Sequence, residues 1–69
     1  MYSKYDRLAS AIITKLQNEI DKGNIYENQG QKELREFSDK LAKTDLTYQE
    51  KYQLKTMLSN RIDNLNYFN

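Results

Sequence analysis

Apolar side chains recur every three or four positions along the first third of the chain, which is the spacing of one face of an α-helix. At 100° per residue these positions fall within a sector about 140° wide. Ser3 followed by Asp6 has the spacing of a helix N-terminal cap. Gly23, after Lys22, suits the left-handed backbone conformation that ends many helices. We therefore expect a helix over residues 4–22 whose buried face consists of Tyr5, Leu8, Ala9, Ile12, Ile13, Leu16 and Ile20.

A second, narrower apolar stripe follows a short polar break. Its other faces carry acidic and basic residues four positions apart, which is typical of a solvent-exposed helix surface. Asn24 and Glu27 have the capping spacing, so we expect a helix over residues 25–43. Gly30 lies in the stripe, where glycine costs about 1 kcal/mol relative to alanine. It marks either a close approach of a neighbouring backbone or a helix that begins only near Gln31. The stripe consists of Tyr26, Gly30, Leu34, Phe37 and Leu41.

A third stripe begins after the break at residues 44–47. Thr47 and Glu50 have the spacing of a capping box, in which each side chain accepts a hydrogen bond from the other residue's backbone N–H. We expect a helix over residues 48–66, with the tail Tyr67-Phe68-Asn69 either frayed or packed back. The apolar face of this helix consists of Leu54, Met57, Leu58, Ile62 and Leu65.

The two connections between these helices are short, which favours antiparallel neighbours. The sequence therefore predicts an all-α fold, a small three-helix antiparallel bundle running up, down and up, with residues 1–69 forming a single helical domain. An alternative is a helical hairpin whose third helix packs on another copy of the chain. A chain of 69 residues can bury only one modest core, so self-association as a homodimer stays open.

Charge and composition exclude several classes of function. The chain has 11 basic and 10 acidic residues, mixed along its length, so it lacks the basic block that duplex DNA binding usually needs. It has no Cys and no His, which removes thiol chemistry, zinc sites of the usual type and the commonest general base. No apolar run approaches the ~20 residues of a membrane span, and the polar N-terminus does not resemble a signal peptide. We expect a cytoplasmic protein with no membrane partner.

Candidate chemistry is sparse. The carboxylates of Glu33 and Glu36 have the spacing of a solvated helix face, and no apolar cleft can be inferred around them. The turn after the first helix lacks the oxygen ligands of a calcium loop, since Ile25 and Lys32 occupy two of the ligand positions. We expect no catalytic residue, no cofactor and no metal site, and the protein is predicted not to be an enzyme.

Arg61 is a charged side chain that the pattern places on the apolar face of the third helix, between Met57 and Leu65. The first and third helices are expected to run parallel, so Glu19, at the edge of the first stripe, should lie near the same end. We predict a Glu19–Arg61 ion pair of structural importance. Failing that, the stem of Arg61 is buried and its guanidinium reaches water.

Tyr48 and Tyr52 lie one turn apart, about 100° from the centre of the third stripe, so the core does not require them. Exposed tyrosines are enriched in protein interfaces because the ring buries a large area while the hydroxyl keeps its hydrogen bond. We take Tyr48, Tyr52, Lys55 and Tyr67 as candidates for partner binding. Two other interpretations are that the rings cover the second helix or lean on neighbouring lysines, and that they stack on nucleic-acid bases.

The leading hypothesis is a non-enzymatic protein that binds and blocks a larger protein. An abundance of Lys, Asn, Ile and Tyr, with no Pro, Trp or His, suggests an AT-rich genome such as that of a phage or mobile element. A small inhibitor or immunity-type protein, acting in the host cytoplasm if phage-encoded, fits this description. One alternative is a dimeric nucleic-acid-binding regulator that presents Lys51, Lys55 and Arg61, although the charge disfavours nucleic acid. Another is a structural subunit of a larger assembly.

Overall fold

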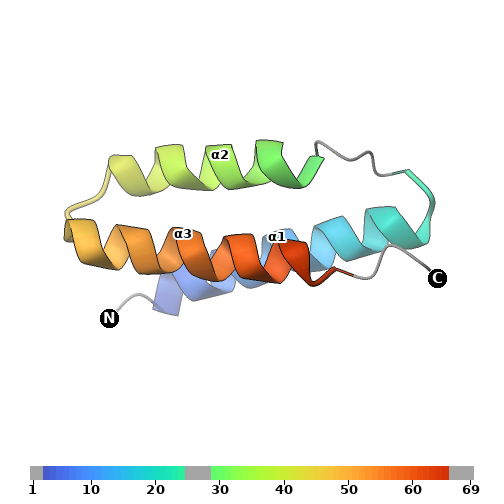
Figure 1. Ribbon diagram of the computed structural model, residues 1–69, viewed down its shortest axis with the longest axis horizontal. Coiled ribbons are helices and arrows are strands. Elements are labelled where there is room, and N and C mark those ends of the chain that lie inside the picture. The colour runs from blue at the N-terminus through green and yellow to red at the C-terminus, as the bar shows by residue number, and fades with distance from the viewer. Residues whose placement is uncertain (1–2, 25–28, 66–69) are drawn as a thin grey trace.

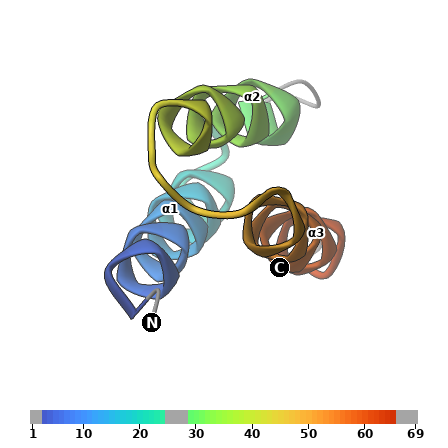
Figure 2. The ribbon, with the colours of Figure 1, turned by 90° about the vertical axis from the view of Figure 1, so that its left-hand side faces the viewer.

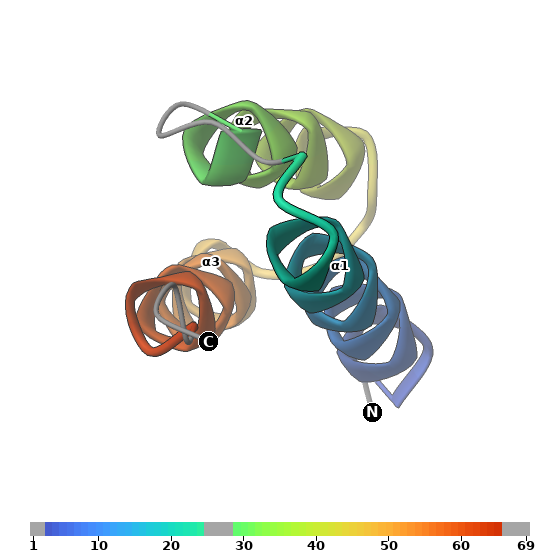
Figure 3. The ribbon, with the colours of Figure 1, turned by 90° about the vertical axis from the view of Figure 1, so that its right-hand side faces the viewer.

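The part of the chain that the structure describes folds into three helices. The computed structural model describes residues 3–24 and 29–65, which form α1 (Ser3–Asp21), α2 (Gln29–Ala42) and α3 (Tyr48–Asp63). α1 and α3 run in the same direction and α2 runs against them (Figure 1). All three pairs of helices are in contact, and the two end-on views show them at the corners of a triangle (Figures 2 and 3). The predicted all-α, up-down-up bundle is confirmed.

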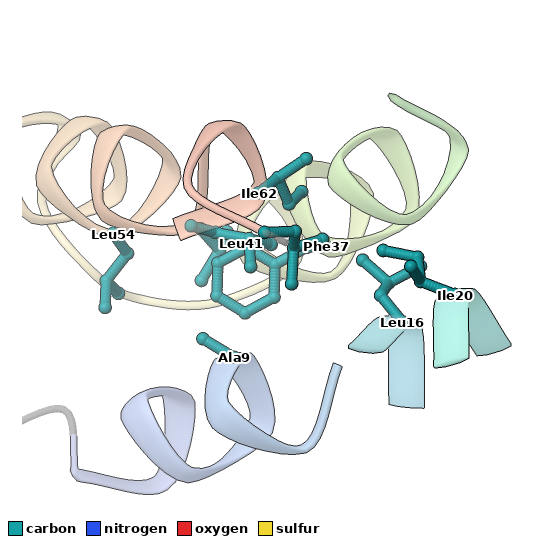
Figure 4. Close-up of a cluster of buried hydrophobic side chains, with 9 residues drawn as sticks. Ala9, Leu16, Ile20, Phe37, Leu41, Leu54 and Ile62 are labelled. Carbon is teal, nitrogen blue, oxygen red and sulfur yellow. The ribbon is translucent and has the colours of Figure 1, made fainter. Parts of the chain in front are cut away.

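Every helix contributes to one apolar core. Its most deeply buried large side chains are Leu16 from α1, Phe37 and Leu41 from α2, and Leu54 and Leu58 from α3. Each adds about 1.5–3 kcal/mol when fully removed from water. In Figure 4 the side chains of Phe37 and Leu41 point toward Ala9 of α1. The core thus lies where the three predicted stripes meet. The partly buried residues packed against it are Tyr5, Leu8, Ile12, Ile13, Leu34, Leu46 and Met57.

The end of α1 depends on a glycine. Gly23 has a φ of +75°, the left-handed region that other residues rarely adopt. Its N–H donates to the Ile20 carbonyl at 2.9 Å, and the Asn24 N–H donates to the Glu19 carbonyl at 2.9 Å. These two bonds are those of a Schellman motif, so the predicted role of Gly23 is confirmed. The side chain of Ser3, the predicted cap of α1, lies outside the described part.

The packing of the first turn of α2 explains why a glycine occupies position 30. α2 begins at Gln29, and residues 25–28, which include the predicted cap partner Glu27 and the stripe residue Tyr26, lie outside the described residues. Gly30 is buried in the first turn, and a Cβ atom built on it would lie 2.7 Å from Cγ2 of Ile62. The close approach is present, but the neighbour is an α3 side chain rather than a backbone.

α3 begins with the predicted capping box. The Glu50 N–H donates to Thr47 Oγ1 at 3.1 Å, and the Thr47 N–H donates to Glu50 Oε1 at 2.9 Å. The helix ends at Asp63, earlier than the expected residue 66. Asn64 caps this end, and Leu65 still reaches the core, with 9% of its surface exposed. The apolar stripe therefore continues to Leu65, two residues past the end of the helix that carries it.

Candidate protein-binding surface

Two large side chains remain outside the core on α3. Tyr48 is 84% exposed and Tyr52 is 60% exposed. They lie one turn apart, so both rings project from the same side of the helix. This placement agrees with the expectation that the core does not require them. Two aromatic rings are therefore in contact with solvent, although a protein of this size has few large side chains from which to build its core.

The two tyrosines border a groove between α2 and α3. One hollow, with a volume of about 130 Å³, is lined by Ser38, Leu41, Ala42, Tyr48, Lys51, Tyr52 and Lys55. A second, with a volume of about 240 Å³, is lined by Leu34, Tyr52, Lys55, Thr56, Ser59 and Asn60. Because Tyr52 and Lys55 line both hollows, we treat the two as one surface and call it the α2–α3 groove. No α1 residue lines it, and α1 lies on the other side of the α2–α3 pair in Figure 2.

The structure brings together three of the four candidate partner-binding residues. Tyr48, Tyr52 and Lys55 all line the groove, whereas Tyr67 lies outside the described residues. The rings stand beside α2 without being buried by it. The interpretation that they merely cover the second helix therefore accounts for only part of their surface.

Sequence reasoning did not predict the α2 wall of the groove. Ser38 and Ala42 lie on the side of α2 that the charge pattern assigned to solvent, and they line the groove with Leu41. Both side chains are small, which leaves room beside the Tyr52 ring. The signal that could have found this wall is the pair of small residues, Ser38 and Ala42, four positions apart next to an apolar stripe.

Arg61 has a different partner from the predicted one. Its Nη1 donates to Ser10 Oγ at 3.0 Å, which links α3 to α1, and the residue is exposed. Glu19 lies nine residues beyond Ser10 along α1, or about 14 Å at 1.5 Å per residue. This distance is too great for the same guanidinium to reach both, so the structure does not bring Glu19 and Arg61 together.

The expectation that Glu33 lies on a solvated face is wrong. Glu33 is only 7% exposed, because α1 packs against that flank of α2. Its Oε1 accepts a hydrogen bond from Lys15 Nζ at 3.1 Å. This hydrogen bond, together with the negative charge of Glu33, raises the pKa of Lys15 above its ordinary value of 10.5. We interpret the pair as a structural link between α1 and α2.

Two other kinds of site, a metal centre and a membrane span, find no support in the described residues. Among the residues that the structure describes, no three His, Cys, Asp or Glu side chains lie close enough together to hold a metal ion. None of the helices in the described ranges is long and apolar enough to cross a bilayer. Comparisons of the chain with protein-family models, with curated proteins and with solved structures return no match. We therefore interpret the groove from its own chemistry.

Proposed function

We propose that this chain is a non-enzymatic protein that binds a larger partner protein through the α2–α3 groove and thereby blocks or alters that partner. The exposure of Tyr48 and Tyr52 carries the proposal. A tyrosine ring offers a large contact area with only two side-chain torsions to order, and its hydroxyl can keep a hydrogen bond when the ring is covered. Two such rings beside an apolar floor are the kind of cluster that dominates binding energy at interfaces.

The size of the molecule is compatible with this role. An interface of ordinary size takes about 800 Å² from each partner. The whole chain exposes 5199 Å², so a partner covering the groove and its rim would occupy roughly 15% of the surface. One face is therefore enough for stable binding, and a small protein can obstruct a much larger one. An inhibitor or immunity-type role in the cytoplasm, with a phage or mobile-element origin, is part of the same proposal.

The test is capture of the partner from a lysate of the native host. Tagged wild-type protein and the Tyr48→Ala/Tyr52→Ala variant are used in parallel, with Gln49→Ala as a control because Gln49 is exposed on α3 and lines neither hollow. Mass spectrometry should find a protein retained by the wild type and by Gln49→Ala and lost by the tyrosine variant. Equal recovery with all three baits would remove the tyrosines from the interface and contradict the proposal.

Nucleic-acid binding is the second candidate, because Lys51 and Lys55 line the same hollow as Tyr48 and Tyr52. Single-stranded nucleic acid is often held by aromatic stacking next to positive charge. Arg61, the third basic residue of this hypothesis, bonds to α1 and lines neither hollow. A salt-titrated gel shift decides between the candidates: binding that weakens steeply with salt supports nucleic acid, and no shift at low salt removes it.

A further inference from the structure

The charges around the α2–α3 groove all have one sign. Of the residues that line it, Lys51 and Lys55 are the charged ones, and no carboxylate is among them. The chain as a whole has nearly equal numbers of basic and acidic residues, 11 and 10. The groove is therefore a locally positive surface on a protein that is close to neutral.

The positive charges of Lys51 and Lys55 repel each other unless a negatively charged group lies close to both. They are four residues apart, so their ammonium groups lie on the same side of α3, where like charges repel. Within the described residues, neither side chain forms an ion pair with a carboxylate. A ligand that brings carboxylates to this rim gains two attractions and relieves one repulsion.

The spacing of the lining residues fits a helical ligand. The residues that line the groove include a row at positions 48, 52, 55 and 59 on α3 and a row at positions 34, 38 and 41 on α2, with positions 51, 56, 60 and 42 beside these rows. Steps of four and three residues form a straight seam along a helix, the pattern by which helices pack side by side. The lining residues span 34–42 on α2 and 48–60 on α3, so the groove is roughly 12–18 Å long at 1.5 Å per residue. That length matches a ligand helix of about two to three turns.

We propose that the occupant of the α2–α3 groove is an acidic amphipathic helix of the partner protein. Its apolar side chains pack between Tyr48, Tyr52 and the small residues of α2, and its flanking carboxylates pair with Lys51 and Lys55. This inference rests on the proposed function and adds the chemistry of the partner. The shape of the groove and the sign of its charge support it independently of each other.

The experiment selects ligands without assuming the partner. A display library of random 18-residue peptides is panned against the wild-type protein, and peptides that also bind Tyr48→Ala/Tyr52→Ala are depleted. The remaining peptides bind through the tyrosines. We expect them to be enriched in Asp and Glu next to apolar residues spaced three and four apart. An excess of neutral or basic peptides would overturn the inference and leave the proposed function in place.

A charge-reversal pair tests the same point quantitatively. The most enriched peptide is titrated against Lys51→Glu/Lys55→Glu and against the control Lys32→Glu/Lys43→Glu, which makes the same change in net charge at exposed residues that line neither hollow. We expect an affinity loss of at least tenfold for the first variant and less than twofold for the control. Equal losses would refute a specific role of Lys51 and Lys55.

Two further outcomes distinguish this inference from the proposed function on which it rests. If no peptide survives the depletion step, the tyrosines do not bind helical ligands and the inference fails, whereas the proposed function is decided by the lysate capture. A fluorescent single-stranded oligonucleotide is titrated in parallel. If it binds the wild type, and both the tyrosine and the Lys51/Lys55 variants lose that binding, the ligand is a nucleic acid and the acidic helix is rejected.

Discussion

The contact between Gly30 and Ile62 predicts that the effect of Gly30→Ala on stability depends on the residue at position 62. The substitution should destabilise the wild type but not a variant with a less crowded side chain at that position. In Gly30→Ala, the new Cβ atom would lie 2.7 Å from Cγ2 of Ile62, whereas carbon atoms normally approach to about 3.5–4.0 Å. Ile62 is 5% exposed and branched at Cβ, so it cannot easily turn away. Overpacking of this kind costs about 1–3 kcal/mol. The helix propensity of alanine returns up to about 1 kcal/mol.

The expected net result for Gly30→Ala is a loss of about 1 kcal/mol in the free energy of unfolding. In a domain of this size such a loss lowers Tm by about 4–8 °C. Ile62→Leu removes the branch at Cβ while keeping the side-chain volume. In that background Gly30→Ala should cost nothing or stabilise the protein. Urea denaturation followed by circular dichroism at 222 nm measures all four proteins of this double-mutant cycle.

The cycle can refute the reasoning in two ways. The first is that Gly30→Ala stabilises the wild-type background, which would mean that helix propensity outweighs the contact and that α2 is free to move away from α3. The second is that the two substitutions are additive to within about 0.5 kcal/mol, the limit expected for residues that do not touch. Either result would show that the first turn of α2 does not pack on the end of α3 as described.

Four further predictions concern the links between the helices and their ends. Gly23→Ala should cost about 1 kcal/mol because of its positive φ alone, since no atom lies within 4 Å of the added methyl group; Gly23→Asn should cost less. Thr47→Ala should cost about 1 kcal/mol by removing a cap. The hydrogen bonds to the Thr47 backbone and side chain lower the pKa of Glu50 below 4.5. The stability that this carboxylate contributes is therefore present above pH 4.5 and lost as the pH falls through the lowered pKa. Acid unfolding curves of Glu50→Gln that superimpose on those of the wild type would refute this prediction. The raised pKa of Lys15 means that its contribution is present below pH 10.5 and lost as the pH rises through the raised value, so the stabilities of wild type and Glu33→Gln should converge only in strong alkali.

Much of the fold was predictable because local patterns determine it. The three apolar stripes mark the faces that meet in the core, and the Thr47–Glu50 spacing and Gly23 mark helix ends through bonds within a few residues. Each of these features is determined by residues only a few positions apart in the chain. They can therefore be inferred before the helices are assembled.

The features that sequence reasoning missed depend on how the helices are placed against each other. Glu33 is buried because α1 covers it and supplies Lys15, which is 18 positions away in the chain. Arg61 meets Ser10 rather than Glu19 because of the offset between α1 and α3 along their axes. Periodicity identifies which face of a helix is buried, but it does not say how far one helix slides along another. For the same reason, it identified the tyrosines of the candidate site and missed the α2 wall beside them.

The proposed binding surface requires that Tyr48 and Tyr52 be available to a partner rather than needed by the fold. The most direct measurement is the free energy of unfolding of Tyr48→Ala/Tyr52→Ala beside that of Phe37→Ala, whose ring is 1% exposed. We expect the phenylalanine variant to lose about 3–5 kcal/mol and the double tyrosine variant to lose no more than about 1 kcal/mol. A loss in the tyrosine variant as large as that in Phe37→Ala would place both rings in the core and contradict the account.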